Sequence, residues 1–140
     1  MSGGSSVKLI RSVSSLQQRR ILLVTYHDDE RQLYGDALEH AGLTVIRISD
    51  PDEALRLATS QPPAAMVTRI LQPGYSIDGI ELTRAIKSNP PTASVPVIII
   101  SSLPQPEHRA AALVAGCDEY LLLPVLPDEL VATVKRVVGR

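Results

Sequence analysis

The sequence predicts an α/β protein in which five parallel strands form a doubly wound sheet with helices on both faces. Short apolar runs alternate five times with longer segments of helical periodicity, and the 140 residues fit one domain. Phe and Trp are absent while 44% of residues are hydrophobic, so the core is aliphatic, as buried parallel strands require. Parallel strands need crossover connections, which are usually helices and right-handed.

The apolar runs set the expected strands, and the periodic segments between them set the expected helices. Strands are predicted at 21–25, 43–48, 64–70, 95–102 and 119–123, and helices at 28–42, 50–61, 78–89, 106–116 and 127–138. The run VPVIIISS, at 95–102, shows no alternation, which is typical of a strand buried on both faces.

Acidic residues and glycines mark the helix boundaries. Asp28 or Asp29 can cap the first helix, Gly42 can end it, Asp50 before a proline suits the start of the second, and Asp78 suits the N-cap of the third. Periodicity places four residues of the last helix and three of the first on inward faces: Leu130, Val131, Val134 and Val138, and Leu33, Ala37 and Leu38.

Residues 1–20 are rich in Ser, Gly, Gln and Arg, which predicts a tail or linker ahead of a domain at 21–140. Within that segment Val7, Ile10 and Val13 have helical spacing, which is compatible with a short docked helix. The chain shows no internal repeat.

Composition argues against several classes of function. The net charge of −1 provides no basic field for nucleic acid, and no apolar run reaches the roughly twenty residues of a membrane span. The single Cys117 precludes an internal disulfide and indicates a small buried hydrophobe in a reducing compartment. The beginning of the chain does not resemble a signal peptide, so we expect a cytoplasmic protein. No membrane contact is expected either.

The histidines and the first loop argue against two kinds of ligand. His27, His40 and His108 are scattered without the spacing of metal ligands, so no metal site is expected. The first strand is followed by TYHDDER, which is too acidic to cradle a phosphate and argues against a flavin cofactor.

Three stretches of this chain resemble the receiver domain of bacterial response regulators over about residues 20–139. QPG and then DG follow the third strand, the fourth strand ends on hydroxyls, and AGCDEYLLLPVLPDEL precedes the last helix. The resemblance implies the flavodoxin-like (CheY-like) fold with strand order 2-1-3-4-5. It also implies that Tyr120 is the family's switch aromatic and that Pro124 follows a cis peptide bond.

The resemblance further implies a phosphorylation site, and this chain departs from it at most positions. In the family, two acidic residues after the first strand and an aspartate ending the third bind Mg²⁺, and that aspartate accepts the phosphoryl group. These positions fall on Thr25, Tyr26 and Arg69. The family's lysine falls on Leu123, whereas its hydroxyl is retained as Ser101. Mg²⁺, which prefers carboxylate oxygens, is therefore not expected to bind, and no cofactor is expected.

Arg69 has two interpretations. It is a structural cation that pairs with Asp28 or Asp29 above the sheet, or it is a pseudo-switch or anion site beside Ser101. Asp28 and Asp29 likewise have two interpretations, as a displaced metal pair or as first-turn residues favoured by the helix dipole.

The resulting hypothesis is a degenerate receiver, or pseudo-receiver. It would act as a phosphorylation-independent protein–protein interaction module in two-component, phosphorelay-type signalling and not as an enzyme. One alternative is a receiver phosphorylated on another carboxylate, at Asp28, Asp29 or Asp78; another is a flavodoxin-like small-ligand binder. The expected partner is another signalling protein or a second copy, bound through the fourth helix, fifth strand and fifth helix. The residues expected there are His108, Arg109, Ala112, Tyr120, Lys135 and Arg136.

Overall fold

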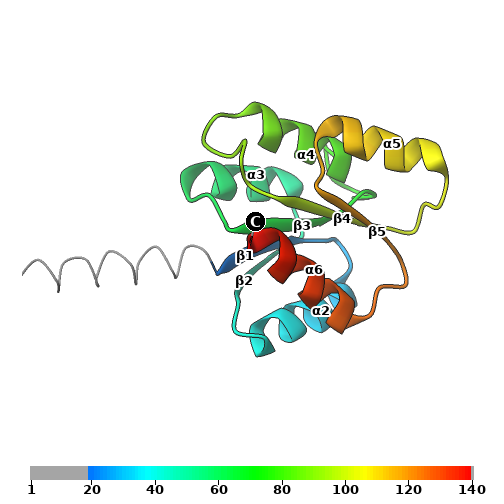
Figure 1. The fold of residues 1–140 in the computed structure, drawn as a ribbon. Helices are drawn as coiled ribbons and strands as arrows, with labels where there is room; N and C mark the ends of the chain where they lie inside the picture. The colour runs from blue at the N-terminus through cyan, green and yellow to red at the C-terminus, as the bar shows by residue number, and fades with distance from the viewer. Residues whose placement is uncertain (1–18, 140) are drawn as a thin grey trace, which may run out of the picture.

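The computed structural model describes residues 19–139, and within them five parallel strands form one sheet (Figure 1). The strand order is β2-β1-β3-β4-β5, so the predicted fold class and order are confirmed. The predicted docked helix around Val7 lies outside the described residues. The strands are β1 (Arg20–Val24), β2 (Thr44–Ile48), β3 (Ala65–Arg69), β4 (Val97–Ser101) and β5 (Glu119–Leu122).

Helices cover both faces of the sheet, as a doubly wound chain requires. Helices α2 and α6 lie against one face, and α3, α4 and α5 lie against the other (Figure 1). Alternate strand residues feed two cores: Leu23 and Val67 belong to the cluster that includes α2 and α6 residues, whereas Leu22 and Met66 belong to the other. The helices are α2 (Asp28–His40), α3 (Pro51–Ser60), α4 (Gly79–Ser88), α5 (Pro106–Ala115) and α6 (Pro127–Val138).

The helix starts are partly as predicted. Asp50 caps α3 by accepting a hydrogen bond from the Asp52 amide, and Asp78 caps α4 in a capping box with Glu81. Helix α2 differs, because its N-cap is His27, which makes no side-chain cap hydrogen bond. Asp28 and Asp29 lie in the first turn, where the helix dipole favours negative charge.

One predicted inward position is wrong. Leu33 is 52% exposed, whereas α2 buries Tyr34 together with the predicted Leu38. In α6, the predicted Val138 is partly buried and packs against the core, and Val137 beside it is also buried. Gly35 lets the Arg47 guanidinium lie against α2, because a Cβ at residue 35 would be 2.5 Å from Arg47 Cζ.

The Asp-Gly pair at the start of α4 packs closely against the end of β3. The Gly79 amide donates to the Ile70 carbonyl at 2.8 Å, and a Cβ on Gly79 would lie only 1.9 Å from the Arg69 carbonyl oxygen. The start of α4 can therefore approach the last residue of β3 only because residue 79 is glycine.

Within the described range of 19–139, none of the helices combines the length and the apolar character needed to cross a membrane.

Candidate functional site

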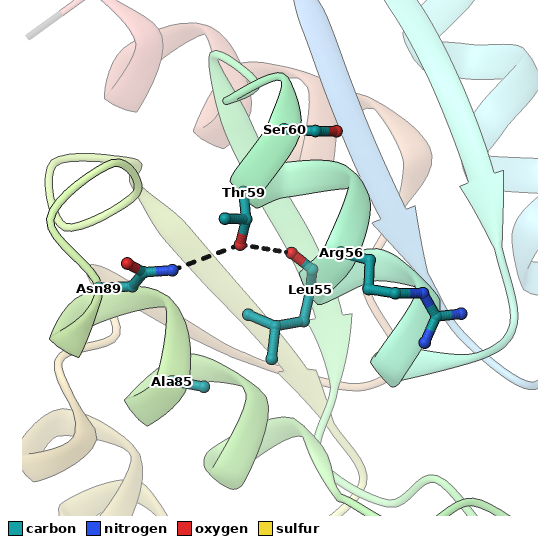
Figure 2. A pocket seen from close by; sticks show the side chains of 6 residues that line it. All are labelled: Leu55, Arg56, Thr59, Ser60, Ala85 and Asn89. Carbon is teal, nitrogen blue, oxygen red and sulfur yellow. Dashed lines mark hydrogen bonds between the residues drawn. The ribbon is translucent and has the colours of Figure 1, made fainter.

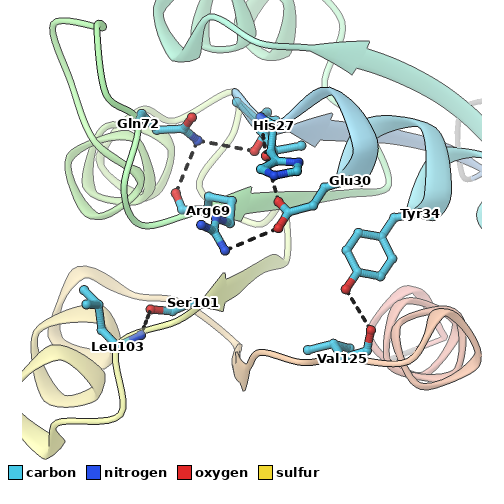
Figure 3. Close-up of polar contacts among 10 residues, drawn as sticks. His27, Glu30, Tyr34, Arg69, Gln72, Ser101, Leu103 and Val125 are labelled. Atoms are coloured by element: carbon cyan, nitrogen blue, oxygen red, sulfur yellow. Dashed lines mark hydrogen bonds and ion pairs between the residues drawn. The ribbon is translucent and has the colours of Figure 1, made fainter.

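The ends of three neighbouring strands bring polar residues together at one edge of the sheet (Figure 3). Thr25 follows β1, Arg69 ends β3 and Ser101 ends β4. The register pairs Val24 with Thr68 and Arg69 with Ile100, so Thr25 and Arg69 leave adjacent strands at the same level, and Ser101 follows one residue further along β4. In open α/β sheets ligands bind outside the carboxyl ends of the strands, which makes this edge the candidate site.

Arg69 is buried at this edge and paired with Glu30 from α2. Its Nη1 lies 3.4 Å from Glu30 Oε2, and the side chains are only 8% and 16% exposed (Figure 3). The guanidinium also lies near the Tyr26 ring, with Cζ 5.7 Å from its centroid. The Arg69 Nε has no hydrogen-bond partner. The predicted pairing with Asp28 or Asp29 is wrong, because Glu30 is the helix residue that points back toward the sheet.

Both oxygens of the Glu30 carboxylate have partners. Thr25 Oγ1 donates to Glu30 Oε1 at 3.0 Å, while Oε2 faces Arg69. Thr25 itself is fully buried, and its hydroxyl accepts a hydrogen bond from the His27 amide at 3.1 Å. The Glu30 carboxylate in the first turn of α2 therefore neutralises the buried cation, and the Thr25 hydroxyl after β1 holds that carboxylate in place.

Gln72 adds a buried polar side chain to this edge from the β3–α4 loop. Its buried side-chain amide donates to the Val24 carbonyl and the Arg69 carbonyl, both at 3.3 Å, and to Thr68 Oγ1 at 3.2 Å. These bonds join the ends of β1 and β3, and they leave the Gln72 Oε1 without a protein partner.

Ser101 and Tyr120 are both bonded to Leu103. The Leu103 amide donates to Ser101 Oγ at 2.9 Å (Figure 3), and the Tyr120 hydroxyl donates to the Leu103 carbonyl at 2.8 Å. Tyr120 is 8% exposed, and the Arg109 guanidinium on α5 lies 5.9 Å from its ring centroid. Ser101 and Tyr120 therefore both anchor the backbone of Leu103 in the β4–α5 loop.

The β5–α6 loop contains the predicted cis bond, at Leu123–Pro124. The Leu123 amide donates to the Ser101 carbonyl at 2.7 Å, so the position of the family's lysine holds an aliphatic side chain beside β4. One residue beyond the proline, the Val125 carbonyl accepts a hydrogen bond from the Tyr34 hydroxyl at 2.7 Å (Figure 3). Burial raises the pKa of Tyr34, and the nearby Glu30 charge adds to the rise.

The residues at this edge do not fit a magnesium ion. Mg²⁺ needs an octahedral set of oxygen ligands, and here the one facing carboxylate, Glu30, is engaged by Arg69 and Thr25. Asp28 pairs with Arg31 and its side chain is 86% exposed. Among residues 19–139, no three His, Cys, Asp or Glu side chains group so that they could hold a metal ion.

The other carboxylates considered as acceptors lie outside this pocket or are otherwise engaged. Asp29 is an exposed first-turn residue of α2. Asp78 accepts a hydrogen bond from the Glu81 amide at 2.8 Å, which is a capping role at the start of α4.

Sequence reasoning missed Glu30 and Gln72. Glu30 lies in the first turn of a helix that starts at the same edge as Arg69, but Asp28 and Asp29 share that turn, so no sequence signal singled it out. For Gln72 the signal was a polar residue three positions after the last residue of a fully buried strand.

The predicted interface residues divide into accessible and buried ones. Arg109, Lys135 and Arg136 are exposed, and His108 is half-buried. Ala112 and Tyr120 are buried, so their inclusion in an accessible surface is a wrong prediction. Helix α5 turns Ala112 to the sheet and presents its neighbours outward, and the large hydrophobic residues exposed here on α5 and β5 are Leu113, Val114 and Leu122.

Comparison with known proteins places this geometry in a family. The model of the response regulator receiver domain matches residues 21–135. The phosphate regulon transcriptional regulatory protein PhoB of Pseudomonas aeruginosa is 30% identical over 122 residues, which are 87% of this chain and 52% of PhoB. This chain therefore spans about half the length of that relative. An uncharacterised 14.6 kDa protein of Leptolyngbya boryana is 32% identical over 89% of this chain and 93% of its own length.

A solved structure agrees with the sequence relatives. The receiver domain of the sensor histidine kinase PA1611 from Pseudomonas aeruginosa PAO1, which has a magnesium ion in its active-site cleft, superposes with a TM-score of 0.79. It is 27% identical over 87% of this chain and 98% of that one. The family match, the strand order and the polar edge lead to one conclusion: this chain belongs to the response regulator receiver domain family.

Proposed function

We propose that this receiver domain works as a phosphorylation-independent protein–protein interaction module in two-component signalling. The observation that carries the proposal is the buried ion pair between Arg69, at the end of β3, and Glu30. By resemblance to the family, the end of β3 is where the phosphoryl-accepting aspartate stands.

A guanidinium at that position cannot take the aspartate's role. Its nitrogens act as hydrogen-bond donors only, so it offers no lone pair with which to attack phosphorus. The sequence contains no Asp or Glu between Glu53 and Asp78, so β3 and its following loop supply no substitute before the α4 cap.

The surroundings of Arg69 are equally unsuited to phosphoryl transfer. Such transfer depends on a metal ion and a cation that spread the charge of the transferring group. Thr25 and Tyr26 are neutral, Leu123 is aliphatic, and the Arg69 charge itself opposes a divalent cation. These features support a domain that signals by binding and not by catalysis.

The proposed partner surface lies on α5, β5 and α6. Leu113, Val114 and Leu122 are exposed there, and Arg109, Lys135 and Arg136 supply charge around them. Large apolar side chains that stay exposed on a folded domain can serve as contacts for a protein partner. We infer a cytoplasmic signalling protein or a second copy of this chain as the partner, with no role for nucleic acid in this domain.

A magnesium titration followed by two-dimensional amide NMR tests this function. The amides of Thr25, Glu30, Arg69 and Gln72 are expected to keep their positions as Mg²⁺ is added at millimolar concentration. The matched control is the triple variant Thr25→Asp, Tyr26→Asp, Arg69→Asp, which rebuilds the three family carboxylates and is expected to shift at these amides. Saturable shifts at this edge of the wild-type protein would contradict the proposal.

A further inference from the structure

An open groove runs between α3 and α4, on the face of the sheet away from α2 and α6 (Figure 2). Its volume is about 490 Å³, enough for several side chains. Leu55 and Ala85 line it from opposite helices, and at one end the Asn89 side-chain amide donates to Thr59 Oγ1 at 3.4 Å (Figure 2). The full lining is Leu55, Arg56, Thr59, Ser60, Ala85 and Asn89.

The groove has an apolar floor and charged rims. A second hollow of about 440 Å³ continues it along the same two helices and shares Leu55 and Ala85. Exposed Glu53 and Arg56 flank it on α3, and exposed Glu81 and Arg84 flank it on α4. A bound segment would therefore need one apolar side and one polar side.

The described part of the chain begins beside this groove. The Arg20 guanidinium donates to Gln61 Oε1 at 2.9 Å and to the Pro62 carbonyl at 3.3 Å. Gln61 is the C-cap of α3 and directly follows Ser60, which lines the groove. The described chain therefore begins near the C-terminal end of α3, at one end of the groove.

The sequence of that preceding segment has the pattern that the groove requires. At 3.6 residues per turn, the apolar residues of 7–16 fall on one side, namely Val7, Leu9, Ile10, Val13 and Leu16. Lys8 and Arg11 fall on the other side, and residues 1–18 contain no Asp or Glu. Ten residues of helix span about 15 Å, which equals the length of the ten-residue α3.

We propose that residues 7–16 bind the α3–α4 groove of the same molecule as an amphipathic helix. Their apolar side covers Leu55 and Ala85, and their basic side lies at the rim that carries Glu53 and Glu81. The occupant is the chain's own segment because it is tethered at Arg19, next to the groove, which gives it a higher effective concentration than a second copy. The inference does not depend on whether the domain is phosphorylated.

Disulfide trapping tests this docking. In a Cys117→Ala background, Ile10→Cys is combined with Ala85→Cys in the groove or, as the matched control, with Lys135→Cys on α6. Both proteins are checked for native circular dichroism and oxidised in a glutathione buffer. The groove pair is expected to form an intramolecular disulfide at least about tenfold faster than the control pair. Equal rates, or a disulfide only between molecules, would overturn the proposal.

A second pair of variants separates docking from chance encounter. In the groove-pair protein, Val13→Asp places a charge on the apolar side and is expected to slow disulfide formation to the rate of the α6 control. Ser12→Asp carries the same charge on the polar side and is expected to leave the rate within about twofold. An unchanged rate in the Val13→Asp protein would overturn the proposal.

Discussion

The Arg69 guanidinium and the Glu30 carboxylate face each other across the sheet edge at 3.4 Å, and both side chains are largely hidden from solvent. A buried cation is tolerated when a carboxylate compensates it, and breaking one partner of such a pair leaves an uncompensated charge. The stability of the fold therefore depends on α2 supplying the Glu30 carboxylate that compensates the Arg69 charge.

The first prediction concerns that dependence. Glu30→Gln is expected to lower the free energy of unfolding by about 3 kcal/mol, because Arg69 keeps its charge in a shielded place. Urea denaturation measures the change. The control is Asp28→Asn, which removes an ion pair with Arg31 on the exposed surface and is expected to cost less than about 1 kcal/mol. Equal losses in the two variants would show that the Arg69–Glu30 pair is solvated.

A second prediction concerns the close approach at Gly79. Gly79→Ala is expected to lower the free energy of unfolding by about 3 kcal/mol or more, because its methyl group would meet the Arg69 carbonyl oxygen at 1.9 Å. The comparison is Gly74→Ala, where the added Cβ meets open space but φ is +87°, so the cost is about 1 kcal/mol. A Gly79→Ala loss no greater than that of Gly74→Ala, measured by denaturation, would argue against this contact.

A third prediction addresses the shared anchor on Leu103. Tyr120→Phe removes the hydrogen bond to the Leu103 carbonyl and is expected to cost about 1 kcal/mol while speeding exchange of the amides in 102–105, where Pro104 has none. Tyr34→Phe loses a similar bond, to Val125, and is expected to leave exchange at 102–105 unchanged. If both variants alter that loop equally, Tyr120 does not hold it specifically.

A fourth prediction follows from the buried cysteine. Burial, reinforced by the nearby Asp118 charge, raises the pKa of Cys117 from an ordinary value of 9.0 to about 11. The folded protein therefore keeps the thiol neutral over a range in which the unfolded chain ionises it. This contribution to stability is fully present below about pH 9 and is lost as pH rises toward about 11, with a total near 2–3 kcal/mol.

The Cys117→Ala variant isolates this contribution. Denaturation at several pH values should show that the stability difference between wild type and variant is constant below pH 9 and shifts in favour of the variant up to pH 11. A difference that stays constant through pH 11 would mean that the thiol is not shielded.

Much of the fold could be predicted because local signals agreed with the global pattern. The uninterrupted apolar run of β4 and the capping residues Asp50 and Asp78 appear in the structure where the sequence placed them. Leu33 was misplaced because periodicity alone does not fix the rotation of a helix. In the folded protein α2 buries Tyr34 and brings Gly35 against Arg47, and these contacts between elements cannot be read from periodicity.

The sequence predicted the site residues at the strand ends, but it did not predict Glu30 and Gln72, which pair with them. Arg69 and Ser101 follow from where their strands stop, which a pattern of apolar runs reveals. Glu30 could not be told from Asp28 and Asp29 by sequence, since all three lie in one helical turn, and only the direction of α2 decides which one reaches Arg69. For the same reason, the sequence could not show that Ala112 is buried while Leu113 stays exposed.

A fifth prediction concerns restoration of phosphorylation. Arg69→Asp alone is expected to gain no phosphoryl group from Mg²⁺ and acetyl phosphate, because Thr25, Tyr26 and Leu123 still supply no metal carboxylate and no cation. The quadruple variant Thr25→Asp, Tyr26→Asp, Arg69→Asp, Leu123→Lys is the positive control and is expected to gain one. Modification of the single variant would show that those three positions matter less than the chemistry of the site indicates.

The most direct measurement is the intact mass of the wild-type protein after incubation with Mg²⁺ and acetyl phosphate, beside a receiver domain known to accept the phosphoryl group. We predict an unchanged mass for this chain while the comparison domain gains one phosphoryl group. A gain of one phosphoryl group by the wild-type chain, mapped by peptide analysis to Asp28, Asp29 or Asp78, would contradict phosphorylation-independent signalling.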